Sequence, residues 1–174
     1  VYIPILQRYD ADYPWIKGLT LHGWEQDRWL LPALAWEDWE PIISDIQGRL
    51  DDATIERAVA KLPPEYAALD GARLTTDIQG RRDGLPRAAR RYYEHLARQV
   101  DIQTSDAPHE VHVSRGEGGR TRVSVRTLGG IDGAAVEPGI PAGASGAPAR
   151  VLFDREFRPD ETKELRLYLR GGDD

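Results

Sequence analysis

The chain has 174 residues, of which 40% are hydrophobic, so it can bury one substantial core or one core with a small satellite. Its net charge of −6 argues against a nucleic acid or an anionic membrane as a partner. No apolar run approaches the ~20 residues that span a bilayer, and the lack of cysteine excludes disulfides and thiolate metal sites.

The first 23 residues show no clear hydrophobic period, and residues 19–21 are predicted to be extended. All five tryptophans fall early in the chain: Trp15, Trp24, Trp29, Trp36 and Trp39. Such side chains fill a core, contact another polypeptide or stack on a sugar, and the sequence leaves these alternatives open. We take Trp15, Trp24 and Trp29 as candidate interface residues.

Three short helices are predicted next, over residues 25–34, 37–50 and 52–62, from apolar residues at three- and four-residue steps. Asp51 or Asp52 is the expected cap of the third helix. Pro63-Pro64 should end it, because neither proline donates a backbone hydrogen bond. We expect a turn over residues 65–69 and a cap at Asp70.

A long helix near residues 71–99 should follow, with Leu74, Ile78 and Leu96 among its apolar face. Pro86 lies inside it and removes one intrahelical hydrogen bond. A kink is therefore favoured, because the apolar face continues across Pro86. The alternative is a break, with the helix restarting at Pro86.

After Val100 the apolar period changes to two, which is typical of strands. Strands are expected near residues 100–104, 111–113, 123–125, 151–157 and 164–169, with Gly116–Gly119 as a hairpin turn. Residues 128–149 are rich in Gly, Ala and Pro and should form a loop or linker. The predicted class is α+β, with a helical bundle over residues 1–99 and a small antiparallel β part over residues 100–174.

Four arginines of the long helix, Arg87, Arg90, Arg91 and Arg98, recur at three-, four- and seven-residue steps. Such a stripe could hold a phosphate. The alternative is a solvated helix face paired with Glu94 and other acids, and the negative net charge favours it.

Metal and catalytic motifs are weak. His109 and His112 project to opposite faces of a strand, so they cannot share a metal. Asp10 and Asp12 supply too few ligands for calcium. Gly171–Asp174 matches only the start of a calcium-binding repeat, and no Walker loop or nucleophile elbow is present. We assign no catalytic residue, metal ligand or cofactor.

Several stretches together resemble a known kind of protein. They are Gly18–Thr20, Asp27–Leu31, Leu62–Gly71, Arg81–Asp83, Arg91–Ala97 and Glu161–Leu169 running into Gly171–Asp174. They resemble an interior region of large exported bacterial proteins labelled as metallophosphoesterase or BamA/TamA-type outer-membrane proteins. The helical half is also similar to the C-lobe end of CotH-type kinase-like domains, whose catalytic acids would lie upstream of Val1.

The chain starts at Val1 and lacks methionine, so we expect a fragment of a longer protein. The predicted function is a noncatalytic structural or interaction module that packs against other domains of the same parent chain. The resemblance implies the cell envelope or periplasm as its location. The alternative is the C-terminal part of a CotH-like phosphotransferase or a phosphoesterase whose catalytic residues lie outside this chain.

Overall fold

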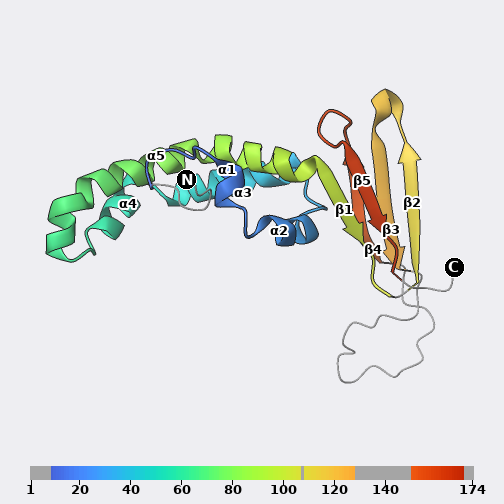
Figure 1. Cartoon of the computed structure of the whole chain (residues 1–174), viewed down its shortest axis with the longest axis horizontal. Helices are drawn as coiled ribbons and strands as arrows, with labels where there is room; N and C mark the ends of the chain where they lie inside the picture. Colours follow the sequence, from blue (N-terminus) through green and yellow to red (C-terminus); the bar gives the residue numbers. More distant parts are fainter. Residues whose placement is uncertain (1–8, 107, 128–149, 171–174) are drawn as a thin grey trace, which may run out of the picture. The chain divides into compact units, whose positions relative to one another are not determined.

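The structure is a computed structural model of the chain, and it describes residues 9–106, 108–127 and 150–170. Figure 1 shows the helices and strands that these residues form. The helices are α1 Ile16–Leu19, α2 Trp24–Leu30, α3 Trp36–Arg49, α4 Asp52–Val59 and α5 Pro64–Ala97. The strands are β1 Gln99–Gln103, β2 His109–Arg115, β3 Thr121–Thr127, β4 Val151–Phe157 and β5 Glu164–Tyr168. The α+β class predicted from the sequence is confirmed.

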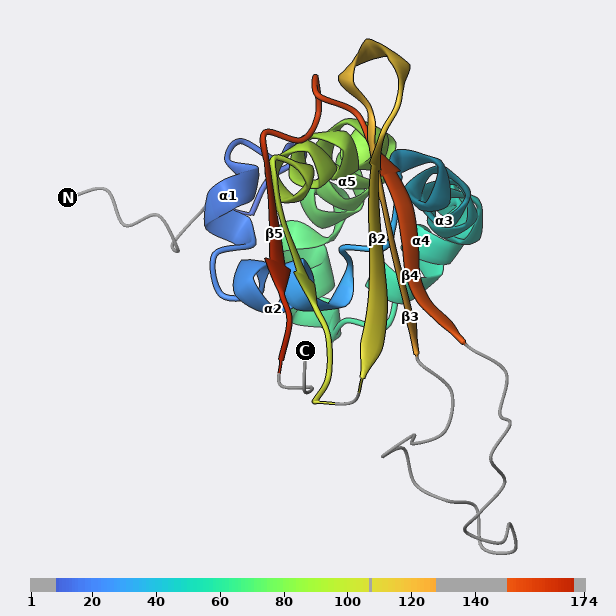
Figure 2. The same cartoon turned by 90° about the vertical axis from the view of Figure 1, so that its right-hand side faces the viewer.

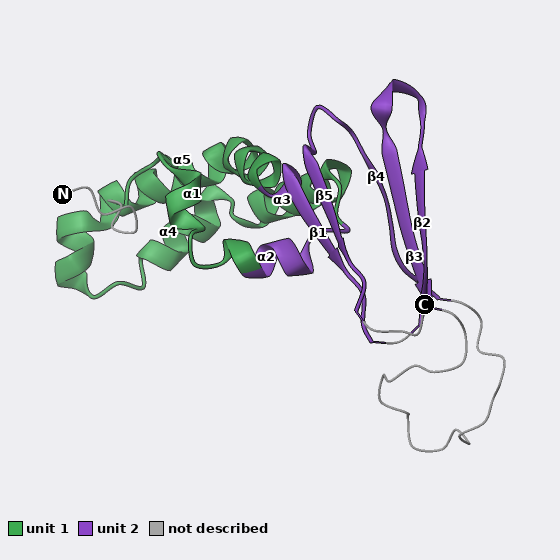
Figure 3. Cartoon of the chain, turned by 45° about the vertical axis from the view of Figure 1, so that its right-hand side comes forward, with its two compact units in different colours: residues 1–25, 34–95 green, residues 26–33, 96–174 purple. Residues whose placement is uncertain are grey.

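The chain divides into two compact units, coloured separately in Figure 3. The first unit comprises Val1–Glu25 and Leu34–His95, and the second comprises Gln26–Ala33 and Leu96–Asp174. The segment Gln26–Ala33 comes early in the sequence and yet belongs to the unit that holds the strands. Among the described helices, none has both the length and the apolar character needed to cross a membrane.

The first unit is built on α5, against which α3 runs antiparallel. Near the start of α3, the ring of Trp36 lies 5.5 Å from that of Tyr93, between centroids, and the ring of Trp39 lies 5.9 Å from it. Near the end of α3, Gln47 Nε2 donates to the carbonyl oxygen of Arg82 over 2.8 Å. Trp36, Trp39 and Gln47 are three and eight positions apart, which places them on one side of a helix, so one face of α3 meets α5.

The start of α5 corrects two expectations. Residues 65–69 are helical rather than a turn, because α5 begins at Pro64, where the missing N–H of proline needs no intrahelical partner. Asp70 therefore lies inside the helix and does not cap it. Helix α5 also continues through Pro86 to Ala97 without interruption, so it does not restart there.

Two shorter helices give one confirmation and one correction. Asp51 caps α4 as expected, since its Oδ1 accepts a hydrogen bond from the Thr54 N–H over 2.7 Å. Residues 19–21 are not extended, because α1 ends at Leu19 and a turn follows it.

The second unit contains a three-stranded antiparallel sheet, in the order β2-β3-β4, and a parallel pair, β1 and β5 (Figure 2). The parallel pair corrects the expectation that all strands would be antiparallel. The predicted hairpin between β2 and β3 is confirmed, and Gly118 and Gly119 adopt positive φ angles of 68° and 76° in its turn.

The core of the second unit joins the two sheets. It contains side chains from β1, β3 and β4: Val100, Ile102, Val123, Val125, Phe153 and Phe157. Val111 of β2 and Leu165 of β5 pack against them. The predicted loop over residues 128–149 and the partial repeat at Gly171–Asp174 lie outside the described residues.

Candidate functional site

A groove of about 450 Å³ lies within the second unit. One wall comes from the end of α2 and the residues that follow it, with Trp29, Leu30, Pro32 and Ala33. The rest comes from β1 and the residues after it, from β3 and from β4: Ile102, Gln103, Thr104, Ser105, Val125, Leu152 and Phe153. Its volume is in the range of ligand sites, and its lining is mainly apolar.

Two arginines hold the segment Gln26–Ala33 on the strands. Arg28 Nη2 lies 2.6 Å from Asp101 Oδ2 on β1, and both side chains are nearly buried. Arg155 of β4 is 7% exposed, and its Nη1 donates to the carbonyl oxygen of Pro32 over 2.7 Å. The wall of the groove is thereby fixed at both ends by charge-assisted hydrogen bonds.

The two largest side chains of this wall are open to solvent. Trp29 is 60% exposed and Leu30 is 76% exposed. The guanidinium of Arg170 lies 5.7 Å from the centroid of the Trp29 ring, and its Nη2 donates to Gln103 Oε1 over 2.8 Å. The groove therefore combines an exposed apolar wall with one basic group at its rim.

Strand β4 borders the groove on another side. Val125 pairs with Phe153 and Arg126 with Val151, so Leu152 is an extra residue in a β-bulge. Val151 and Leu152 are 50% and 46% exposed. Because of the bulge, Leu152 has no paired residue on β3, and its apolar side chain lines the groove.

The four candidate phosphate-contacting arginines do not form one site among the described residues. Arg87 Nη2 lies 2.8 Å from Asp12 Oδ1. Arg90 Nε lies 2.8 Å from Glu94 Oε1, and its guanidinium lies over the ring of Trp36 at 4.8 Å. Arg91 is exposed in the first unit, and Arg98 is exposed in the second. Two of the four thus contact acids of the same unit.

The three candidate interface tryptophans do not belong to one unit. Trp15 and Trp24 are half-buried in the first unit, where the Trp24 ring lies 6.1 Å from that of His95. Of the three, Trp29 alone lines the groove.

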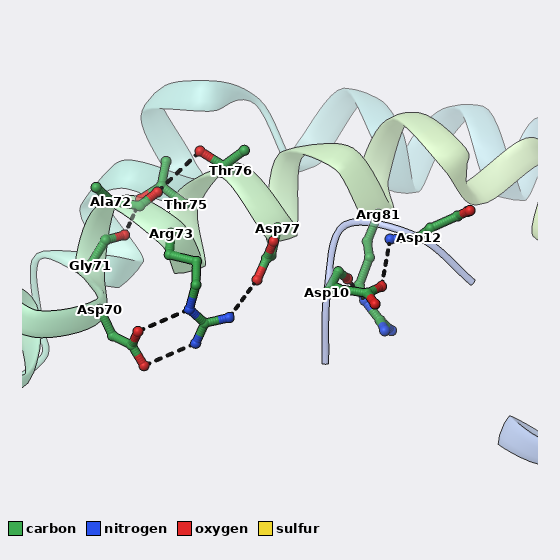
Figure 4. Close-up of polar contacts among 10 residues, drawn as sticks. All are labelled: Asp10, Asp12, Asp70, Gly71, Ala72, Arg73, Thr75, Thr76, Asp77 and Arg81. Atoms are coloured by element: carbon green, nitrogen blue, oxygen red, sulfur yellow. Dashed lines mark hydrogen bonds and ion pairs between the residues drawn. The ribbon is translucent and has the colours of Figure 1, made fainter. Parts of the chain in front are cut away.

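Several acids of the first unit contact arginines. On α5, Arg73 contacts Asp70 at 2.9 Å and Asp77 at 2.7 Å (Figure 4). The hydrogen bond from Arg73 lowers the pKa of Asp70, and the backbone N–H of Tyr13 lowers that of Asp12. No cluster of three or more His, Cys, Asp or Glu residues in the described ranges could hold a metal ion.

Sequence reasoning found Trp29 but not the groove. Its wall and its strands are far apart in the sequence, as the 123 residues between Pro32 and Arg155 show. The one local signal was the run Trp29-Leu30-Leu31, which carries more apolar surface than a short helix can bury.

Comparisons of this chain with protein-family models, curated proteins and solved structures find no match.

Proposed function

We propose that this chain is a noncatalytic interaction module of a larger bacterial envelope protein, which packs against or positions other domains of the same polypeptide. The apolar groove of the second unit supports this most strongly. Exposed apolar surface beside a groove is a common mark of an interaction site, and here Trp29 and Leu30 provide that surface.

The contacts of the arginines favour this function over a phosphate site. Arg87 and Arg90 contact Asp12 and Glu94, so a phosphate would have to displace a carboxylate at each position. The bacterial envelope as a location is supported by the resemblance of the sequence to large exported proteins.

A docking experiment tests the proposal. Hydrogen–deuterium exchange would compare the 174-residue chain alone with the same chain joined to its neighbouring coding sequence. We expect slower exchange around residues 29–33 and 151–153 in the longer polypeptide. The variant Leu30→Glu should remove that protection, while Leu69→Glu should not, because Leu69 is a similarly exposed leucine (84%) of α5 in the first unit.

A second measurement separates the module from an enzyme. Purified chain is incubated with ATP or p-nitrophenyl phosphate and Mg²⁺ or Mn²⁺, and we expect no turnover above buffer. Turnover that disappears in Arg90→Ala or Arg91→Ala would overturn the noncatalytic function. Equal exchange in the short and long polypeptides would overturn the docking role.

A further inference from the structure

We infer that the second unit binds an extended strand from another domain of the same polypeptide along the outer edge of β4, with apolar side chains of that strand entering the groove. This inference rests on the proposed function, because it names the kind of partner that the groove takes.

The outer side of β4 offers backbone hydrogen bonds. It is an edge strand in the order β2-β3-β4, and no described strand pairs with its outer side. An edge strand presents a row of N–H and C=O groups to which an extended chain can add. The groove adjoins β4, because Leu152 and Phe153 of this strand line it. A single extended ligand can therefore use both features.

The side chains of β4 indicate the chemistry of that ligand. Asp154 and Glu156 lie on the exposed face, where an arginine of β3 and the arginine just before that strand contact them. Arg122 contacts Asp154 at 2.7 Å, and Arg120 contacts Glu156 at 3.1 Å. Because opposite charges on adjacent strands attract, a strand added beyond β4 should carry lysine or arginine on this face. Its other face should be apolar, because it meets the groove.

Two registers of a second copy of β4 do not fit this requirement. Antiparallel pairing centred on Asp154 would set that residue against its own copy. Pairing centred on Arg155 would set Asp154 against Glu156 of the other copy. Both arrangements place like charges opposite one another, which destabilises a strand pair. We therefore take the ligand to be a different, basic and apolar segment.

Synthetic peptides provide the probe. The first alternates valine with lysine over about eight residues, the length of a long strand, with both ends blocked. Isothermal titration calorimetry with the 174-residue chain at low salt should detect binding. Replacing every lysine by glutamate should weaken binding about tenfold, as expected from two reversed cross-strand charges. A proline at the centre of the lysine peptide should abolish binding, because proline removes a ladder donor.

Variants of the chain locate the binding. Asp154→Lys with Glu156→Lys should reverse the preference, so that the glutamate peptide binds better. Because those changes leave Arg122 and Arg120 without acids, the milder pair Asp154→Asn with Glu156→Gln is also measured and should remove the discrimination. Leu30→Ala should weaken both peptides. Glu110→Lys is the matched control, because Glu110 is exposed on β2 at the other edge of the same sheet.

The outcomes are distinct. No heat with the lysine peptide, equal binding of the proline peptide, or an equal effect of Glu110→Lys would each overturn strand addition at β4. If the longer polypeptide still protects residues 29–33 in the exchange experiment, the interaction module stands and strand addition alone fails. If that protection is also missing, both fail.

Discussion

Gly80 on α5 lies so close to Ala11 that a Cβ atom at Gly80 would stand 2.7 Å from the Ala11 Cβ and 3.0 Å from its carbonyl oxygen. The adjacent residue of α5 holds the same segment, because Arg81 Nε donates to the carbonyl oxygen of Asp10 over 2.6 Å. The Arg81 guanidinium also lies 4.2 Å from the ring centroid of Tyr9. The segment before α1 is thus packed tightly onto the middle of α5.

The first prediction concerns this close approach. Gly80→Ala should destabilise the first unit by about 1–3 kcal/mol, because the added methyl group must displace backbone atoms of Ala11. Alanine would otherwise favour a helix by up to about 1 kcal/mol, so the two effects oppose each other. Urea unfolding followed by circular dichroism at 222 nm measures the net change in the free energy of unfolding.

Gly48 in α3 is the matched control, because a Cβ atom there would meet nothing within 4 Å. Gly48→Ala should raise the free energy of unfolding by up to about 1 kcal/mol. If the two glycines respond alike, the contact with Ala11 does not contribute.

Local sequence patterns predicted much of the fold. Strand β4 over Val151–Phe157 and the cap at Asp51 follow from alternation and from the chemistry of a helix start. The predicted start of α5 was wrong because a Pro-Pro pair is typical of a helix end and also suits the first position of the next helix. A proline alone does not distinguish these two roles.

Long-range contacts account for the rest. Arg28 and Asp101 are 73 residues apart, and nothing near either residue indicates that they meet. The parallel pairing of β1 with β5 has the same cause, because Val100 and its partner Leu165 are distant in the sequence. The groove depends on both contacts, so the sequence could supply Trp29 as a candidate but not its surroundings.

The second prediction tests the contact between Arg28 and Asp101. Removing one partner should leave a nearly buried charge without its counter-ion, since the two side chains are only 13% and 12% exposed. We expect Arg28→Met to lower the free energy of unfolding of the second unit by about 3 kcal/mol. Urea unfolding, monitored by the fluorescence of Trp29 in a chain whose other tryptophans are phenylalanine, measures it.

The double variant Arg28→Met with Asp101→Leu is the control for this pair. Replacing both charges by apolar groups should recover most of the loss, because no buried charge then remains. Losses that simply add in the double variant would contradict direct pairing.

The third prediction distinguishes two arginines of the same stripe. The Arg90 guanidinium lies over the rings of Trp36 and Tyr93, at 4.8 and 5.4 Å from their centroids. Arg90→Ala should therefore lower the free energy of unfolding by about 0.5–1 kcal/mol, whereas the exposed Arg91→Ala should stay within about 0.5 kcal/mol. Thermal denaturation with and without inorganic phosphate provides both tests. A phosphate-dependent rise in Tm that both variants lose would indicate a phosphate site instead.

The fourth prediction concerns pH. Hydrogen bonds from Thr54 hold the pKa of Asp51 below the ordinary value of an aspartate. The ionised carboxylate therefore stabilises the folded chain above about pH 4, and this contribution is lost as the pH falls through the lower, folded-state pKa. The difference in the free energy of unfolding between the native chain and Asp51→Ala should be constant from neutral pH down to about 5 and shrink below about 4.

Asp51→Asn separates charge from hydrogen bonding at the same position. Asparagine still caps a helix but does not titrate, so this variant should be less stable than the native chain at neutral pH, and the gap should close in acid. Urea midpoints at several pH values, read by circular dichroism, give all three curves. A gap that widens as the pH falls would mean that folding raises the pKa of Asp51, because the protonated carboxyl would then be the form that the fold stabilises.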